Sequence, residues 1–483
     1  MAKWEILNID PWIKDYEDDI NLRMSEYEKA KNRLLGDGQT LSDFANAHHY
    51  YGFHKTKTGW IYREWAPNAD GLYLIGDFND WDRHAHPMKK INDEDWEISI
   101  KGIKTIPHGS RLKVLVDANG KISDRIPLFA KRVERDENGD FAAIMYNPRS
   151  KFKWSDSDFK IKNEDLLIYE AHIGMAGEEG KVSTYKEFEK NILPKIKKAG
   201  YNTVQLMAIA EHPYYGSFGY QVSNFYAPSS WYGEINDLKS LVNTAHKLGL
   251  NVIMDLVHSH AVKNTIEGIN EFDGTDYQFF HTGTKGEHPD WDSKLFDYAK
   301  PGVAHFLLSN VKYWLEEFHF DGFRFDGVTS MIYKNHGRGV SFDHYDKYFS
   351  MNADIEAINY LQMANELARE VKEDVITIAE DMSAMPGMCL PVSQGGIGFD
   401  YRLAMGMPDF WERTLEKRDE EWDLSNMWYE LSTHRPEEKR IAYVESHDQA
   451  LVGSKTTIFT LADQEMYWHM NKDDDNYIVE RAI

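Results

Sequence analysis

Apolar residues alternate with polar ones between residues 48 and 120, and this period of two predicts β-strands. Turn sequences rich in Asn, Asp, Gly and Pro separate the segments at residues 67–71 and 119–120. The predicted strands are residues 60–65, 72–78, 96–100 and 111–116. Several short strands at this spacing indicate a β-sandwich, which we place at residues 41–155.

The segment before the predicted strands has the spacing of apolar residues that is typical of a helix. Apolar side chains over residues 11–35 recur every three or four positions, and Gly36 follows them. Residues 1–40 are therefore predicted to form an N-terminal helical segment.

From residue 166 onward, apolar runs alternate with amphipathic helical segments such as residues 234–248 and 355–372. The seven runs are residues 166–172, 203–207, 252–257, 323–326, 375–379, 399–403 and 441–444. Repeated βα units with near-continuous apolar strands indicate a parallel sheet, and seven of them indicate a (β/α)8 TIM barrel. We place this barrel at residues 156–483 and, since only seven strands are present, expect it to be incomplete at the C-terminus. The long, loop-rich stretch 261–298 is expected to build a wall of the site.

Arg324 and Asp326 lie two residues apart at the end of the fourth barrel strand, so their side chains point the same way. A guanidinium beside a carboxylate favours the ionised carboxylate that a nucleophile or a metal site requires. A purely structural Arg–Asp pair has the same spacing. Other strand ends also carry candidates, because catalytic residues of such barrels sit where strands end. These are Glu211, His212 and Tyr220 after strand two, Asp255, His258 and His260 at strand three, Glu380 and Asp381 at strand five, and His447 and Asp448 at strand seven.

Two chemistries fit these residues. His258 and His260, with the acidic strand ends, are residue types that bind a divalent metal, although Arg324 would repel a cation. The alternative is paired-carboxylate glycoside chemistry, in which one carboxylate attacks the anomeric carbon and a second, of raised pKa, protonates the leaving oxygen. Glu380 follows an apolar run that suits the second role, and Asp381 competes with it. Spacing alone does not choose between them.

The charge and composition of the chain limit the classes of binding partner that it can have. Lys and Arg number 55 against 79 Asp and Glu, a formal net charge of −24, so nucleic acid and anionic membrane surfaces are excluded as partners. The 14 Trp, 27 Tyr and 24 Phe suit stacking against flat apolar faces. The single cysteine, Cys389, rules out an internal disulfide, and no apolar leader precedes the first helix. We therefore expect a cytoplasmic protein.

Four segments resemble, in order and spacing, the four conserved regions of glycoside hydrolase family 13, the α-amylase superfamily. They are residues 255–260, 322–326, 378–381 and 445–449. Three further segments resemble one branch of that family, the 1,4-α-glucan branching enzymes of the eukaryotic type. They are residues 217–222, 323–330 and 445–453. The loop 76–81 resembles the carbohydrate-binding module that precedes the barrel in this family. The resemblance covers essentially the whole chain.

The resemblance implies a glycosyltransferase that cleaves α-1,4 linkages of a linear glucan and transfers the released chain to a 6-hydroxyl, in glycogen biosynthesis. By this resemblance Asp326 is the nucleophile of a retaining double displacement, Glu380 the general acid and base, and Asp448 the third carboxylate, which stabilises the transition state. Substrate-binding residues implied by the resemblance are Tyr220, Asp255, His260, Arg324 and His447 in the barrel and Trp65, Ala66, Pro67 and Arg125 in the module. It implies no metal and no cofactor, an α-glucan polymer (glycogen, starch or maltooligosaccharides) as partner, and a monomer.

Two other functions share these features. An amylase-type hydrolase has the same carboxylates and differs only in using water as acceptor, and a glucan-binding fragment without activity is the second alternative. The chain ends before an eighth strand and before the C-terminal β-domain usual in the family. We therefore expect strands one and seven to be open edges, with low activity and aggregation as the result.

Overall fold

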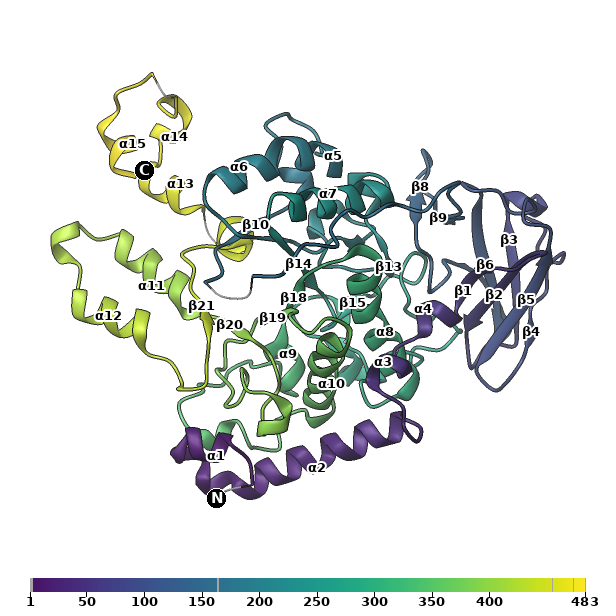
Figure 1. Ribbon diagram of the computed structural model, residues 1–483, viewed down its shortest axis with the longest axis horizontal. Coiled ribbons are helices and arrows are strands. Elements are labelled where there is room, and N and C mark those ends of the chain that lie inside the picture. Colours follow the sequence, from purple (N-terminus) through teal and green to yellow (C-terminus); the bar gives the residue numbers. More distant parts are fainter. Residues whose placement is uncertain (1–2, 163–164, 454, 472, 483) are drawn as a thin grey trace. The chain divides into compact units, whose positions relative to one another are not determined.

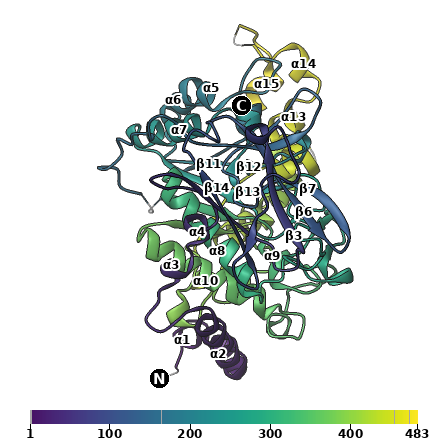
Figure 2. The same ribbon diagram turned by 90° about the vertical axis from the view of Figure 1, so that its right-hand side faces the viewer.

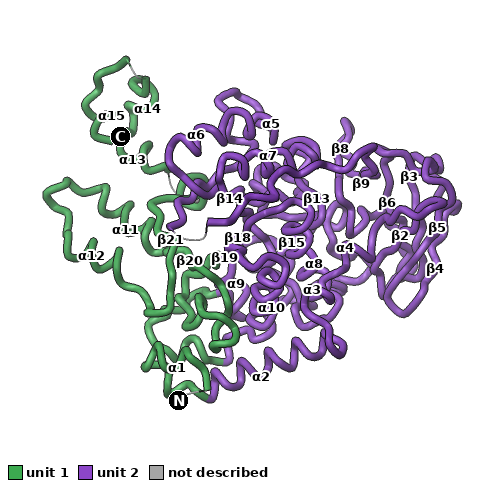
Figure 3. The backbone as a smooth tube through the Cα atoms, in the orientation of Figure 1, with its two compact units in different colours: residues 1–17, 337–350, 378–483 green, residues 18–336, 351–377 purple. Residues whose placement is uncertain are grey.

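The computed structural model describes residues 3–162, 165–453, 455–471 and 473–482. The chain forms two compact units, which Figure 3 shows in purple and green. The large unit consists of residues 18–336 and 351–377, and the small unit of residues 1–17, 337–350 and 378–483. The predicted domain bounds divide the chain differently, at residues 40 and 155. Their outermost residues, 1 and 483, lie outside the described residues, and the bounds stay a prediction.

Helix α1 Ile6–Ile9 opens the N-terminal segment, and a 3-10 turn follows it. Residues Pro11–Tyr16 form the turn η1, which Asp10 caps by accepting a hydrogen bond from the Trp12 N–H at 3.1 Å. Helix α2 follows at Glu17–Leu34. It buries Ile20, Met24 and Tyr27, whose spacing places them on one face. The prediction of one helix over 11–35 is therefore correct for α2 and wrong for η1, because proline and the Asp10 cap favour a tighter first turn.

Two antiparallel sheets follow, one with strand order β1-β2-β5-β4 and one with order β3-β6-β9-β8, in which β7 also pairs with β6. In Figure 2 the strands β3, β6 and β7 face the viewer. The bounds are β1 Gly52–Lys55, β2 Gly59–Trp65, β3 Gly71–Gly76, β4 Lys89–Lys90, β5 Asp95–Lys101, β6 Arg111–Ala118, β7 Lys121–Arg125, β8 Val133–Arg135 and β9 Phe141–Ile144. The four predicted strands correspond to β2, β3, β5 and β6, but β3 stops at Gly76 and residues Asp77–Asn79 form a 3-10 turn.

A buried carboxyl lies inside this sandwich. Glu64 on β2 is fully buried and accepts hydrogen bonds from the Tyr62 hydroxyl at 2.5 Å and from the Trp65 and Leu128 N–H groups at 3.2 Å. Burial raises the pKa of Glu64 from 4.5 to about 7, since the charged form is desolvated.

The raised pKa of Glu64 makes the stability of the fold depend on pH. The stabilisation is fully present below about pH 4.5, where the carboxyl is protonated in both states, and it is lost as the pH rises through about 7. Between these two pH values we expect ionisation of Glu64 to lower the free energy of unfolding by about 3 kcal/mol. Glu64→Gln should flatten the fall in unfolding free energy between pH 4.5 and 7.5, measured by urea denaturation. A slope identical to that of the parent chain would contradict this assignment.

Seven parallel strands form the second sheet, with order β10-β11-β14-β18-β19-β20-β21, so the chain order is also the spatial order (Figure 1). The bounds are β10 Ile168–Ala171, β11 Thr203–Leu206, β14 Asn251–Leu256, β18 Gly322–Phe325, β19 Ile376–Ala379, β20 Tyr401–Leu403 and β21 Arg440–Ile441. Each corresponds to one of the seven predicted apolar runs. A β-sandwich followed by the strands of an incomplete (β/α)8 barrel is the predicted fold class, and the structure confirms it.

The described part of the large unit also contains eight further α-helices besides α2. Their bounds are α3 Leu41–Phe44, α4 Ala47–Tyr50, α5 Tyr185–Glu187, α6 Leu193–Lys198, α7 Ile235–Lys247, α8 Pro301–Phe318, α9 Val328–Ile332 and α10 Ile355–Val371. Helix α8 begins at Pro301, because proline suits the first turn of a helix. Besides the two-stranded pair β12 Ala210–Glu211 and β13 Asn224–Pro228, the long connection 261–298 forms a small antiparallel sheet of β15 Ala261–Val262, β16 Glu287–His288 and β17 Ser293–Lys294.

The small unit holds the remaining helices. Their bounds are α1 Ile6–Ile9, α11 Gly406–Leu415, α12 Leu424–Ser432, α13 Thr457–Ala462, α14 Glu465–Trp468 and α15 Tyr477–Ala482. Among the described residues of the chain, no helix has both the length and the apolar character needed to cross a membrane.

Candidate functional site

Asp326 follows directly after strand β18. Its N–H donates to the Leu256 carbonyl at 3.1 Å, which continues the pairing with β14 by one residue. Gly327 then turns the chain with φ +63° into α9. A Cβ at residue 327 would lie 3.0 Å from Ser259 Oγ and 3.1 Å from the Trp291 ring. Glycine is therefore required here both by its dihedral angle and by its close neighbours.

The guanidinium of Arg324 joins two carboxylates. Its Nη1 donates to Asp326 Oδ1 at 2.9 Å and to Asp255 Oδ2 at 3.0 Å. Arg324 and Asp255 side chains are 2% and 0% exposed, whereas that of Asp326 is 12% exposed. Asp326 is thus held at one oxygen while part of its surface faces outward. Arg324 and Asp326 lie on one side of the strand, as the alternation of the strand predicts.

Asp255 is the buried anchor of this cluster. Besides Arg324, it accepts from Gln205 Nε2 at 2.8 Å and from the Tyr220 hydroxyl at 2.6 Å. Burial and the Asp255 charge raise the pKa of Tyr220 well above its ordinary value, so the phenol stays protonated and donates. Three donors on one buried carboxylate make Asp255 a structural group that orients Arg324 and Tyr220.

Removing the Tyr220 hydroxyl should therefore destabilise the large unit. A hydrogen bond to a charged group contributes about 1.5–3 kcal/mol, and Asp255 keeps two other donors, so we expect Tyr220→Phe to cost about 1.5 kcal/mol. Urea unfolding measures this loss. Tyr214→Phe, whose side chain is 70% exposed, is the matched control and should change little. Equal stability of the two variants would show that the Tyr220–Asp255 bond contributes nothing.

The two histidines after β14, His258 and His260, form hydrogen bonds with other groups of the protein. His258 bonds the Tyr360 hydroxyl at 2.6 Å through Nδ1 and Asn310 Oδ1 at 3.0 Å through Nε2. His260 bonds Ser259 Oγ at 2.9 Å and the Tyr220 carbonyl at 2.7 Å. Burial lowers the pKa of His258 to about 4 and also lowers that of His260, so both rings are neutral near pH 7. Both nitrogens of each ring have protein partners, and a metal at this pair would have to displace them.

In the small unit, the two competing carboxylates after β19 differ in their surroundings. Asp381 is fully buried and accepts from the Ser383 N–H at 2.9 Å, from the Ser383 hydroxyl at 2.7 Å and from the Met385 N–H at 3.2 Å. It orders the loop that follows the strand. Glu380 is partly exposed. The geometry therefore favours Glu380 over Asp381 as the group that meets a ligand.

His447 and Asp448 also belong to the small unit. His447 Nε2 lies 3.4 Å from Asp448 Oδ1. The His447 side chain is buried and that of Asp448 is 45% exposed. The two groups are thus adjacent, and the carboxylate is the one open to solvent.

The four predicted contact residues of the module differ in exposure. Trp65, Ala66 and Arg125 are buried, and Pro67 is partly exposed. The Trp65 indole N–H donates to Glu94 at 3.2 Å. The Arg125 guanidinium donates to the backbone carbonyls of Gly268, Asn270 and Glu271. Arg125 therefore joins β7 to the loop after β15, and its predicted contact with sugar stays a prediction.

Three residues near Asp326 were not predicted. Ser259 Oγ lies 3.3 Å from Asp326 Oδ2, Gln205 donates to Asp255, and the Trp291 ring lies 5.1 Å from that of His260. Gln205 could have been found, because it is a buried amide between the apolar residues Val204 and Leu206 of strand β11. No sequence signal marks Trp291, since more than 30 residues, including strands β15 and β16, separate it from β14.

Comparison with known proteins covers nearly the whole chain. Residues 50–130 match carbohydrate-binding module 48 (isoamylase N-terminal domain), and residues 190–299 and 292–467 match the α-amylase catalytic domain. A 1,4-alpha-glucan-branching enzyme of Rhizophagus irregularis is 49% identical over 96% of this chain and 69% of its own length. One of Yarrowia lipolytica is 48% identical over 99% of this chain and 72% of its own length.

Among solved structures, the catalytic module of the glycogen-degrading pneumococcal virulence factor SpuA has a similar fold. It aligns with a TM-score of 0.61 at 17% identity, covering 87% of this chain and 64% of that one. This likeness shows the fold alone.

Proposed function

This chain belongs to the family of 1,4-α-glucan-branching enzymes, and we propose that it forms α-1,6 branches by a retaining double displacement in which Asp326 is the nucleophile. The observation that carries the proposal is the position of Asp326. It follows a buried parallel strand, Arg324 holds one of its oxygens at 2.9 Å, and its side chain remains 12% exposed. A carboxylate that is fixed, paired with a cation and open on one side suits attack on an anomeric carbon.

The covalent intermediate decides the product. Asp326 attacks the anomeric carbon of an α-1,4 bond, and the reducing-end part of the chain leaves. The retained chain is then attached to Asp326 until an acceptor arrives. Water as acceptor gives hydrolysis, and the 6-hydroxyl of another glucan gives a branch.

Glu380 is the proposed general acid and base. It would donate a proton to the leaving oxygen and later take one from the acceptor hydroxyl. Its partial exposure supports this role, since a proton donor must reach the ligand, whereas Asp381 is fully occupied by its own loop. Asp448 is proposed as the third carboxylate, which stabilises positive charge on the sugar, and its 45% exposure is compatible with that contact.

The remaining residues are proposed to bind the glucan. Tyr220 would stack beneath the sugar next to Asp326, and His260 and His447 would bond its hydroxyls. Tyr220 and His260 would meet the neutral sugar as uncharged groups, because the Tyr220 phenol stays protonated and burial lowers the pKa of His260. Trp65, Ala66, Pro67 and Arg125 are proposed as a contact on the module, with Pro67 the most accessible of them.

An α-glucan polymer is the proposed partner, and we propose a cytoplasmic monomer. The net charge of −24 suits a neutral polymer better than a polyanion. Light scattering on the purified chain tests the monomer.

Product analysis tests the function. Amylose incubated with the chain should lose iodine staining without gaining reducing ends, and debranching of the product should release new short chains. Asp326→Ala is the negative control. A rise in reducing ends equal to the loss of staining would instead indicate an amylase-type hydrolase, and binding without any product would indicate a glucan-binding protein.

A further inference from the structure

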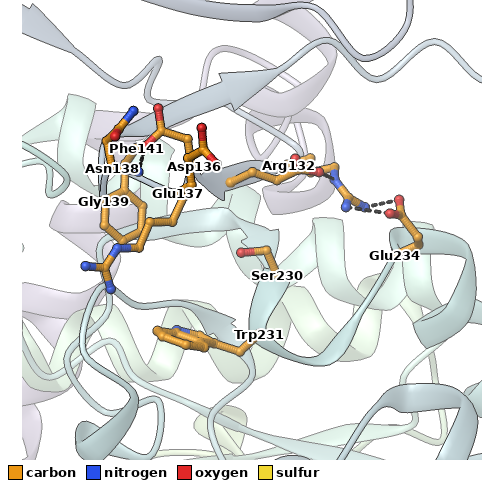
Figure 4. A pocket seen from close by; sticks show the side chains of 11 residues that line it. Arg132, Asp136, Glu137, Asn138, Gly139, Phe141, Ser230, Trp231 and Glu234 are labelled. Atoms are coloured by element: carbon orange, nitrogen blue, oxygen red, sulfur yellow. Dashed lines mark hydrogen bonds and ion pairs between the residues drawn. The ribbon is translucent and has the colours of Figure 1, made fainter. Parts of the chain in front are cut away.

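A pocket of about 640 Å³ lies between the β8–β9 hairpin and the loop that precedes α7 (Figure 4). Both walls belong to the large unit. The volume falls within the roughly 300–1,000 Å³ typical of small-molecule sites. None of its lining residues belongs to the cluster around Asp326 or to the predicted contact residues of the module.

Trp231 forms one side of this pocket. It lies in the 3-10 turn η6 Ser230–Tyr232 and is partly exposed. Its indole N–H donates to the His212 carbonyl at 3.1 Å, and its ring meets that of Tyr215 at a centroid distance of 5.5 Å and an angle of 60°. In Figure 4 the Trp231 ring lies across the pocket from the hairpin residues. Trp231 is therefore a fixed flat surface.

The opposite side is an ordered polar turn. Asp136 Oδ1 accepts the N–H groups of Asn138 and Asp140, each at 2.9 Å, which holds the turn in place. The side chains of Glu137 and Asn138 are exposed at its tip. They supply carboxylate and amide groups that bond hydroxyls as acceptor and as donor.

Arg132 closes the third side and joins the two walls. It is 9% exposed and pairs with Glu134 on β8 and with Glu234 just before α7, where Nη2 lies 2.6 Å from Glu234 Oε1. The hairpin of the sandwich is thereby tied to the barrel, so that the distance across the pocket is set by the fold.

The lining excludes other ligand classes. Two arginines face four carboxylates, so the pocket is net negative and disfavours phosphates and other anions. Asp136, Glu134 and Glu234 are already occupied by the turn and by Arg132, which leaves too few carboxylate oxygens for a cation site. A neutral, polyhydroxylated ligand with a flat C–H face fits both the ring and the polar turn.

We infer that this pocket binds a segment of α-glucan chain at a site separate from the one at Asp326, with a sugar ring stacked on Trp231 and its hydroxyls bonded by Glu137 and Asn138. The inference rests on the proposed function for the identity of the sugar. A second contact on the same polymer raises the effective concentration of chains near the reacting site. It affects the apparent affinity for long glucans and leaves the chemical step unchanged.

Affinity gels test this inference. The full chain carrying Asp326→Asn, which stops turnover, is run in native gels with and without amylopectin, and mobility is normalised to the gel without polysaccharide. Trp231→Ala should raise the apparent Kd about tenfold, and Trp231→Phe should retain most of the binding because it keeps a flat ring. Trp428→Ala, whose side chain is 74% exposed and lies outside the pocket, is the matched control and should bind as the parent.

A second variant keeps the test independent of Trp231 packing. Glu137→Ala combined with Asn138→Ala changes only exposed side chains of the turn and should weaken amylopectin binding by a smaller factor. In chains with Asp326 intact, Trp231→Ala should raise KM for long amylose and leave kcat unchanged. Unchanged amylopectin affinity in both the Trp231→Ala and the turn variants would overturn the inference, as would binding of inorganic phosphate that competes with amylopectin.

The two proposals fail in different ways. If the parent chain is retarded by amylopectin through Trp231 yet makes no branches, the proposed function is wrong and the glucan pocket stands. If branches form and Trp231→Ala has no effect on gel mobility or on KM, the pocket is wrong and the proposed function stands.

Discussion

Replacing Asp326 by asparagine is expected to lower the branching rate by about 10⁴-fold or more, because the loss of one member of a catalytic unit costs nearly as much as the loss of all of them. The amide is nearly the same size and can still accept a hydrogen bond from Arg324, so the fold around it should survive. What is lost is the negative charge that attacks the anomeric carbon. Branch formation on amylose, measured after debranching, gives the rate.

A matched substitution at an exposed aspartate shows whether the loss of rate is specific to the carboxylate of Asp326. Asp292 belongs to the same unit and its side chain is 91% exposed. Asp292→Asn removes one carboxylate in the same way and should leave the rate within about twofold of the parent, as surface substitutions usually do. Asp326→Asn that kept even a tenth of the parent rate would be incompatible with a covalent role for this residue.

Replacing Glu380 by glutamine is expected to slow branching by about 10²–10⁴-fold, the usual contribution of a positioned acid and base. The loss should depend on the leaving group. A glucosyl oxygen needs a proton in order to depart, whereas fluoride does not. Glu380→Gln should therefore still form the covalent intermediate from an α-maltosyl fluoride at a rate close to that of the parent, and Asp326→Asn should not.

Asp381→Asn is the control for Glu380, since the two carboxylates are adjacent. In the parent chain the Met385 N–H donates to Asp381 Oδ2, and an amide NH2 group at that position would place two donors against each other. We therefore expect the substitution to lower the free energy of unfolding by about 1–3 kcal/mol. Its activity, measured below its melting temperature, should stay near that of the parent. The opposite outcome, a stable but inactive Asp381→Asn and an active Glu380→Gln, would exchange the two roles.

The strand pattern predicted the fold well because burial dominates it. The central strands β11, β14, β18 and β19 are buried throughout, and a strand covered on both faces carries few polar residues. The short strands β1, β4 and β7–β9 were not predicted, since two to five residues give too little alternation to detect. The 3-10 turn at Pro11–Tyr16 shows the same limit, because helical spacing does not distinguish a turn of three residues from one of 3.6.

The candidate site was predicted in part, for a related reason. The side chains at the strand ends follow from strand order, and Arg324 beside Asp326 follows from the strand period. The partners of Asp255 do not, since Gln205 and Tyr220 lie 50 and 35 residues away in the chain. The same holds for Arg125, whose carbonyl partners lie 143–146 residues further along. Contacts of this kind depend on tertiary packing, which a single sequence does not display.

Trapping of the covalent intermediate shows which side chain is the nucleophile. The chain is incubated with a 5-fluoro glycosyl fluoride, which forms a covalent glycosyl-enzyme that turns over slowly, and the labelled peptide is mapped by mass spectrometry. We expect a single adduct on Asp326 and none in the Asp326→Asn variant. An adduct on any other side chain would contradict it.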